Sequence, residues 1–292
     1  MSMQRKHLGT GPRASIIIPA YNEARVIGRS LARLLEAAEP GEFDVVVVCN
    51  GCSDDTESVA RSAGGEVRVF SIDQASKSAA LNHADQLART YPRVYLDADL
   101  EVSTAAIRAL IDALDDAHPA AIGFMDIDTK DRPWLVRSFY RLWRLHPYLR
   151  DGKFGGVYAL NRTGCEVRGV YPGLLGDDEY VRNRFTQGQC RSVAGCRFRV
   201  FAPYTVSDIF RIRSRVYLGN LQLRDAGLLR ADGSGESTRR WLRGTLSAPS
   251  NWPALPVYIA VNLLARLNAH RLHWAADYQW LRDNSSRAGA AG

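Results

Sequence analysis

Short apolar runs alternate with helical stretches along the first half of the chain, and this alternation constrains the fold more than any other feature. The runs are rich in Val and Ile and continuous, which is typical of strands buried on both faces of a sheet. They lie at residues 14–18, 43–49, 67–72, 93–96 and 120–124. The helical stretches lie at 23–38, 54–63, 76–90 and 103–117, with Ser53–Asp54, Ser76 and Ser103 as candidate N-caps. The pattern predicts an α/β fold with a doubly wound, mostly parallel sheet.

Composition and charge limit the classes of function. The chain has 292 residues, 46% hydrophobic and 24% charged, which is globular composition with enough length for a sizeable core. Its net charge of +7 favours an anionic partner: a phosphorylated small molecule, an acidic membrane face or nucleic acid. Five cysteines exclude a disulfide scaffold and favour a reducing, cytoplasmic compartment. No run of about 18 apolar residues occurs, so we predict no full membrane span.

Polar clusters follow three of the predicted strands, at Pro19–Glu23, Asn50–Asp55 and Asp97–Asp99. The carboxyl ends of parallel strands share one edge of the sheet, where ligands bind in open α/β folds. Asp97 and Asp99 can both turn toward a hard divalent cation such as Mg²⁺ or Mn²⁺. The alternative is a solvated turn that caps a helix.

Several common motifs are missing from the sequence. No Gly-x-Gly-x-x-Gly follows the first predicted strand, and neither a Walker P-loop nor His-Glu-x-x-His occurs. These absences argue against a dinucleotide oxidoreductase, a P-loop NTPase and a zinc protease. Cys49 and Cys52 have CxxC spacing, but with no second pair we expect a buried strand-end cysteine and a turn cysteine.

Four short motifs, taken together and in order over residues 15–100, resemble family 2 glycosyltransferases. They are Ile16–Glu23, Asn50–Thr56, Lys77–Asn82 and Asp97–Asp99. Farther along, Gly155–Gly156, Asp177–Asp178 and, loosely, Arg211–Arg215 resemble later motifs of the family. The resemblance implies the GT-A fold and an inverting sugar transfer from a nucleotide-sugar donor to an acceptor hydroxyl.

The resemblance also implies donor-site roles for five residues. Pro19, Tyr21 and Glu23 would line the base and ribose of the nucleotide. Asn50 would face the edge of the base, and Lys77 would lie near the ribose and diphosphate. Asn50 stands where the family usually has Asp, but its side-chain carbonyl can still accept from uracil N3–H. UDP is therefore the expected nucleotide, with GDP and dTDP less firmly excluded.

Other roles implied by the resemblance concern the metal and the diphosphate. Asp99 would ligate a Mg²⁺ or Mn²⁺ ion, with Asp97 in the metal shell or at the ribose. Arg215 is a further candidate cation for the leaving diphosphate. The Gln-x-x-Arg-Trp motif of processive synthases is replaced by Ile212–Val216, so we expect transfer of a single sugar.

The acceptor side is implied by two residue pairs. Gly155 and Gly156 would belong to the acceptor site. Asp178 would be the general base, with Asp177 orienting it or reaching the sugar. For Asp177–Asp178 the alternative is a helix N-terminus whose acids complement the helix dipole.

The organisation we expect has four parts. Residues 1–13 form a flexible basic tail, 14–125 the nucleotide-sugar-binding half, 126–229 the acceptor-binding and catalytic half, and 230–292 a helical extension that begins with an exposed loop at 230–238. Residues 254–266 are apolar and flanked by Arg and Trp. That composition is typical of an in-plane helix beside anionic lipid, and equally of a core helix packed on the sheet. In the first case the enzyme lies on the inner membrane face and its acceptor is a lipid or lipid-linked glycan.

Two rival functions come from other classes. A sugar nucleotidyltransferase would carry a Gly-rich, Arg-containing loop after the first strand, where residues 20–23 read Ala-Tyr-Asn-Glu. A non-catalytic nucleic-acid-binding module would use the arginines of 132–150 and 182–199, but these follow no docking motif. We therefore expect no nucleic-acid partner.

Overall fold

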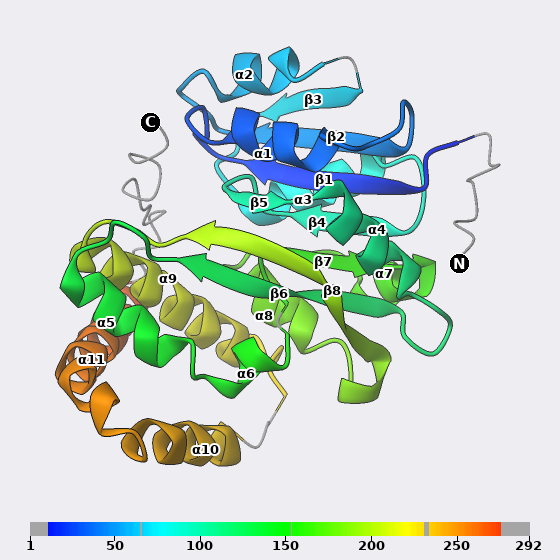
Figure 1. Cartoon of the computed structure of the whole chain (residues 1–292). Coiled ribbons are helices and arrows are strands. Elements are labelled where there is room, and N and C mark those ends of the chain that lie inside the picture. The colour runs from blue at the N-terminus through cyan, green and yellow to red at the C-terminus, as the bar shows by residue number, and fades with distance from the viewer. Residues whose placement is uncertain (1–10, 65, 153, 231–233, 276–292) are drawn as a thin grey trace.

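The computed structural model (Figure 1) describes residues 11–64, 66–152, 154–230 and 234–275, which form one sheet flanked by helices. The strands are β1 Ala14–Ala20, β2 Phe43–Asn50, β3 Val67–Ile72, β4 Arg93–Leu96, β5 Leu100–Val102, β6 Ala120–Asp128, β7 Val157–Leu160 and β8 Cys190–Phe201. The helices are α1 Ile27–Leu35, α2 Thr56–Ser62, α3 Lys77–Leu87, α4 Thr104–Asp112, α5 Trp134–Trp143, α6 Pro147–Arg150, α7 Arg162–Arg168, α8 Asp177–Arg182, α9 Val206–Asp225, α10 Ser234–Leu246 and α11 Leu255–Trp274. Two 3₁₀ turns, η1 Gln187–Gln189 and η2 Pro249–Ala254, join them.

The strand order is β3-β2-β1-β4-β7-β6-β8-β5. β1 to β4 are mutually parallel, β7 is antiparallel to both β4 and β6, and β8 is parallel to β6. The predicted doubly wound, mostly parallel α/β sheet is confirmed. The carboxyl ends of β1, β2 and β4 lie along one edge, where the polar clusters follow.

Helices cover both faces of the sheet because β1 and β2 are apolar on both. Every residue of these two strands is buried. On one face, Ile16 and Ile18 share a core cluster with Leu31 of α1. On the other face, Ile17 shares a cluster with Leu81 of α3. The strands predicted from continuous apolar runs are therefore all present, and the predicted caps Ser76 and Ser103 accept from Ala79 N and Ala106 N. The predicted cap Ser53–Asp54 is wrong, because Asp55 is the N-cap of α2, although Asp54 accepts from Thr56 N at 3.1 Å.

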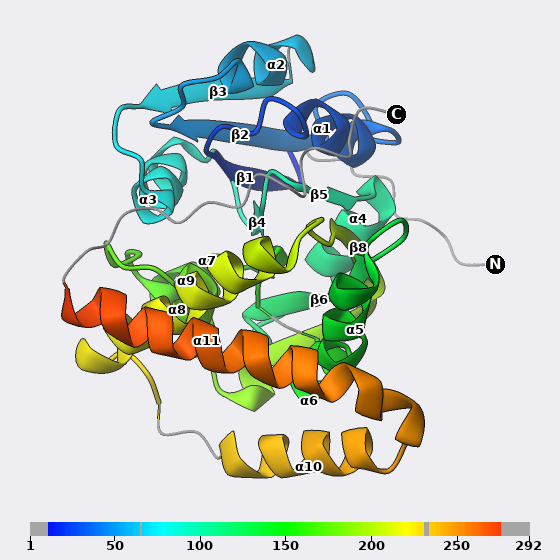
Figure 2. The ribbon, with the colours of Figure 1, turned by 90° about the vertical axis from the view of Figure 1, so that its left-hand side faces the viewer.

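The structure corrects the sequence analysis at the C-terminal end. Residues 230–238 were expected to be an exposed loop, but residues 234–238 belong to α10, which begins at Ser234, so the expectation is wrong for them. Residues 231–233 lie outside the described residues. Of residues 254–266, Ala254 ends η2 and the others fall within α11, which packs mainly on α9 and α5 rather than on the sheet (Figure 2). None of the described helices is both long enough and apolar enough to cross a bilayer.

At the N-terminal end, the expected tail lies mostly outside the described residues, which start at Gly11. Arg13, its last residue, is anchored by ion pairs with Asp112 at 2.6 Å and Glu42 at 3.6 Å. The division of the chain into donor and acceptor halves stays a prediction.

Helix α9 connects the outer helical layer to the edge of the sheet. Gly219 of α9 lies so close to the turn before α8 that a Cβ there would be 3.0 Å from the carbonyl carbon of Leu175. Gln222, one turn later, accepts from Leu175 N at 2.9 Å. The position of α8, and of Asp177 at its start, therefore depends on α9.

A glycine at the start of β7 provides a test of this packing. Gly156 has a φ of +77°, and a Cβ there would lie 2.5 Å from the Phe198 ring. Gly41 has a similar φ of +73° with nothing within 4 Å, so it isolates the backbone cost. We expect Gly41→Ala to cost about 1 kcal/mol of unfolding free energy. Gly156→Ala should cost about 1–3 kcal/mol more, because the added methyl overpacks the core. Urea unfolding measures both, and equal losses would contradict the close packing.

Candidate active site

Lys77 joins three segments that are far apart in the sequence. Its ammonium lies 2.8 Å from Asp97 and 2.8 Å from Asp177. Lys77 is the first residue of α3, Asp97 directly follows β4, and Asp177 is the first residue of α8. The fold thus brings together three of the predicted site residues, from the donor half and the catalytic half alike.

The electrostatics of this cluster are set by burial and by several carboxylates. Burial alone would lower the pKa of Lys77, but Asp177, Asp97 and Asp178 together raise it well above its ordinary value. Lys77 therefore stays protonated. Burial raises the pKa of Asp97, Lys77 opposes that rise, and the charges of Asp99 and Asp177 add to it. Asp99 and Asp177 are thus close enough to Asp97 to influence its protonation.

The donor set at this strand end fits a hard divalent cation. Asp97 and Asp99 supply carboxylate oxygens, which Mg²⁺ and Mn²⁺ prefer. Among the described residues no group of three or more His, Cys, Asp or Glu side chains could hold a metal. A cation held by Asp97 and Asp99 would thus need further oxygens, such as those of a diphosphate. This metal site stays a prediction.

The loops after β1 and β2 are hydrogen-bonded to one another. Asn22, in the left-handed region with φ 53°, accepts from Ser53 N at 2.6 Å. Glu23 N donates to Thr56 Oγ1 at 2.6 Å. Of the predicted donor-site residues in and next to these loops, Pro19, Glu23 and Asn50 are buried and Tyr21 is half-buried. The two motif loops therefore form one unit at the sheet edge, while their contacts with a nucleotide stay a prediction.

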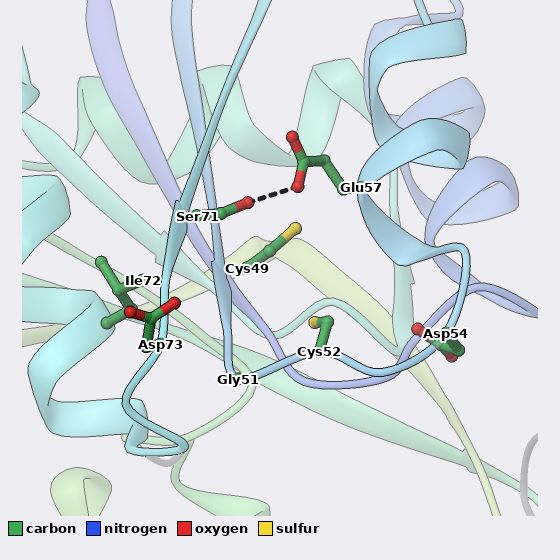
Figure 3. Close-up of a pocket in the computed structure, with 8 residues that line it drawn as sticks. All are labelled: Cys49, Gly51, Cys52, Asp54, Glu57, Ser71, Ile72 and Asp73. Atoms are coloured by element: carbon green, nitrogen blue, oxygen red, sulfur yellow. Dashed lines mark hydrogen bonds between the residues drawn. The ribbon is translucent and has the colours of Figure 1, made fainter.

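A polar pocket lies beside the second motif loop (Figure 3). Its wall combines that loop with α2 and the end of β3: Cys49, Gly51, Cys52, Asp54, Glu57, Ser71, Ile72 and Asp73. Ser71 donates to Glu57 at 2.5 Å across it. Both cysteines are free thiols, Cys49 buried and Cys52 half-buried, as the sequence analysis expected. The pocket itself was not predicted, because β3 and α2 carry no motif.

The predicted acceptor-side glycines lie directly beside the acidic motif. Asp97 N donates to the Gly156 carbonyl at 2.9 Å. Gly155 and Gly156 both have positive φ, 132° and 77°, which explains the glycine pair. This contact places residues 155–156 next to Asp97, and their binding of an acceptor stays a prediction.

The arginines of the late motif separate on α9. Arg211 pairs with Asp208 at 3.3 Å, and Arg213 donates to Asn262 of α11 and to Tyr217. Arg215 is half-buried and lies one turn before Gly219, on the face of α9 that packs beside Asp177. Arg215 therefore shares a helix face with Gly219, and its contact with a diphosphate stays a prediction.

One face of α3 holds the segment that leads to α8. Ser78 donates to the Leu174 carbonyl at 3.2 Å. Asn82 donates to the Tyr171 carbonyl and accepts from Tyr171 N, both at 2.9 Å. These contacts were missed at the sequence level, although Asn82 stands in the Lys77–Asn82 motif. The available signal was helical spacing, because residues 78 and 82 share a helix face.

The cysteine pair in the pocket wall gives a chemical test of the motif loop. A hydrogen bond from Cys49 lowers the pKa of Cys52 most, burial opposes this, and Asn22 N–H adds to it, giving a pKa of about 6. Burial and the same hydrogen bond raise the pKa of Cys49 well above its usual range. We expect iodoacetamide to alkylate Cys52 with a pH midpoint of about 6, faster as pH rises through it because the thiolate reacts.

Mass mapping of the alkylated peptides measures that midpoint. Cys49→Ala removes the hydrogen bond and should move the midpoint of Cys52 upward. A midpoint near the ordinary 9.0 in the unmodified chain would contradict the geometry of the loop.

Comparison with known proteins identifies the family of the chain. The model of the family described as "Glycosyl transferase family 2" matches residues 15–167, more than half of the chain. Glycosyltransferase AglD of Haloferax volcanii is 33% identical over 134 residues, 42% of this chain and 22% of that protein. Succinoglycan biosynthesis protein ExoU of Rhizobium meliloti is 40% identical over 88 residues, 29% of this chain and 25% of that protein. The matched regions thus span a quarter or less of these relatives.

Solved structures share the fold. Mannosyltransferase PcManGT from Pyrobaculum calidifontis, solved with GDP-Man and Mn²⁺, has a TM-score of 0.59 at 20% identity and covers 93% of this chain and 77% of its own. Glucosyl-3-phosphoglycerate synthase from Mycobacterium tuberculosis, solved with Mn²⁺, UDP and glucosyl-3-phosphoglycerate, has a TM-score of 0.54 at 18% identity and covers 79% and 88%. The predicted GT-A fold is confirmed. The chain therefore belongs to glycosyl transferase family 2.

Proposed function

We propose that this chain transfers a single sugar from a nucleotide-sugar donor, a UDP-sugar, to an acceptor hydroxyl with inversion at the anomeric carbon. The observation that carries the proposal is the ion pairing of Lys77 with Asp97 and Asp177, which unites the acidic donor motif with the predicted base segment. The buried Asn50 supports uracil, because its carbonyl can accept from N3–H. The related folds were solved with GDP-Man or UDP, so the identity of the nucleobase is the first part of the proposal to test.

The proposed reaction needs a base, a cation for the leaving group and a fixed geometry. Asp178 takes the proton of the acceptor hydroxyl as that oxygen bonds to the anomeric carbon and the bond to the diphosphate breaks. Asp177, held by Lys77, orients this end of α8. Lys77 and Arg215 are the candidate cations for the leaving diphosphate. A divalent metal held by Asp97 and Asp99 would stabilise the charge that develops on the diphosphate.

The acceptor belongs to the less regular half of the chain. Asp97 N donates to the Gly156 carbonyl, so the predicted acceptor-side glycines adjoin the acidic motif, which supports an acceptor site at this end of the sheet. We propose a lipid or lipid-linked glycan as the acceptor, with the enzyme in the cytoplasm on the inner face of the membrane. This part of the proposal depends on the surface argued in the next subsection.

Two variants separate the donor site from the base. With UDP at about 100 times its Kd and Mn²⁺ present, the wild type should gain about 2.7 kcal/mol of stability in a thermal melt. Asp99→Asn should lose that gain. Asp178→Asn should keep it but lower kcat by about 100- to 10,000-fold, because only the proton acceptor is removed.

Asp225→Asn is the control for those variants, because that carboxylate is exposed at the end of α9 and pairs with His273 at 2.7 Å. It should leave the UDP shift intact. If GDP or dTDP stabilises the protein in the thermal melt and UDP does not, the donor nucleotide differs from the one proposed, and the proposal of a nucleotide-sugar donor stands. No shift with any nucleotide in the presence of Mn²⁺ would contradict the donor site.

Asn82 tests whether α3 positions the base segment. Asn82→Ala removes both hydrogen bonds to Tyr171 and should cost about 1–3 kcal/mol of stability. It should also lower kcat by about tenfold or more, because small displacements of catalytic groups are costly, while UDP affinity changes by less than about threefold.

Asn161 provides a matched control. Its side chain also makes two hydrogen bonds, to Asp115 O at 3.0 Å and from Gly164 N at 2.8 Å, at the end of β7 away from Gly156. Asn161→Ala should lose similar stability and keep kcat. Equal kcat losses in the two variants would refute a positioning role for Asn82.

A further inference from the structure

Helices α10 and α11, with η2 between them, present an exposed apolar surface, which we term the α10–α11 surface. Its large apolar side chains are each at least 44% exposed: Leu242, Leu246, Trp252, Ile259, Leu263, Leu264, Leu267 and Trp274. Single exposed apolar residues are ordinary, but a contiguous group on one element marks an interaction surface.

Helix α11 is apolar on both of its sides. Its inner side, including Val261, Ala265 and Ala269, is buried against α9 and its neighbours. Ile259, Leu263 and Leu267 recur every four residues on the outer side and are 56%, 55% and 59% exposed. A surface helix of a globular protein normally places polar residues there, so the outer stripe needs another explanation.

The charge of this region selects the partner. Residues 237–276 contain no Asp or Glu. Arg239, Arg243, Arg266 and Arg271 are exposed within it. A surface that combines leucines and tryptophans with arginines matches the boundary of an anionic bilayer, where acyl chains and phosphates lie within one side-chain length. A symmetric second copy of the chain would bring like charges together, which disfavours a dimer through this face.

We propose that the α10–α11 surface binds the face of an anionic membrane, with α11 lying in the plane of the bilayer. An in-plane orientation agrees with the finding that no described helix can cross a membrane. The apolar stripe supplies burial beneath the headgroups, and the arginines select anionic lipid.

This surface lies one helix away from the active site. Figure 2 shows α11 crossing in front of α9 over the lower half of the molecule. α9 in turn contacts the turn before Asp177 through Gly219 and Gln222. If the proposed function holds, a membrane-borne acceptor would reach Asp178 from the side on which the protein docks. Membrane binding itself does not depend on the catalytic assignment.

Vesicle flotation of the full chain tests the proposal. The wild type should float with vesicles of phosphatidylcholine mixed with phosphatidylglycerol and much less with phosphatidylcholine alone. The triple variant Ile259→Ser/Leu263→Ser/Leu267→Ser should lower the partition coefficient by about tenfold or more. Arg243→Gln/Arg271→Gln should lower it by about tenfold on the anionic vesicles only.

Val170→Ser is the matched control, because Val170 is 75% exposed and lies outside the α10–α11 surface. It should float like the wild type. Thermal melts and the UDP shift confirm that each variant is folded, and they separate failure of this proposal from failure of the donor site. Absence of wild-type flotation, or equal flotation of the triple variant, would overturn the proposal. So would sedimentation showing a wild-type dimer that the triple variant dissociates without vesicle binding by either.

Discussion

The arrangement of the candidate active site depends on one partly buried cation, Lys77, whose side chain is 23% exposed. Lys77 holds carboxylates that lie 20 and 100 residues away in the sequence, Asp97 and Asp177, each at 2.8 Å. The three side chains are only partly exposed, so removing one of them leaves a poorly solvated charge with fewer partners, which destabilises this arrangement. The ends of β4 and α8 are therefore fixed relative to α3. A site assembled from two halves of the chain gains the rigidity that the transfer of a sugar requires.

The same helix that supplies Lys77 also positions the catalytic half by neutral contacts. Ser78 and Asn82 bind the backbone of residues 171–174, and Asp85, near the end of α3, pairs with the buried Arg168 at 2.7 Å. These contacts supply hydrogen-bond partners for polar groups on the face of the sheet that α3 covers. A buried polar group without a partner there would lower the stability of the fold. The Lys77–Asn82 motif thus has a structural role, because it holds residues 171–174, in addition to the donor contact proposed for Lys77.

The first half of the fold was predictable because its signals are local. β1 and β2 are continuous apolar runs buried on both faces, and Ser76 and Ser103 cap helices within a few residues. β5 has only three residues, and β8 alternates charged exposed residues with buried ones around a register shift, so neither stood out as an apolar run. The helix at 234–246 was hidden by a Gly- and Ser-rich sequence whose helical state a local pattern does not predict.

The site residues were predictable as types, but their partners were not. A motif identifies Lys77, Asp97 and Asp177 separately, and nothing in the sequence states that one ammonium contacts both acids. The contact arises because β4 lies between β1 and β7 and brings the ends of distant segments to one edge. Likewise Asn82 and Tyr171 are 89 residues apart, and only the fold reveals their paired hydrogen bonds.

The distribution of charge also explains how a basic chain can have an acidic site. The net charge of +7 does not lie at the end of β4, where burial and neighbouring acids raise the pKa of Asp97 in spite of Lys77. Arginines instead populate the α10–α11 surface, where residues 237–276 contain no acid. Under the proposed function, a diphosphate approaching Asp97 and Asp99 would be repelled unless a cation accompanied it. The site is therefore suited to bind the donor and a divalent cation together. The positive charge of the α10–α11 surface serves the separate contact with anionic lipid that we propose.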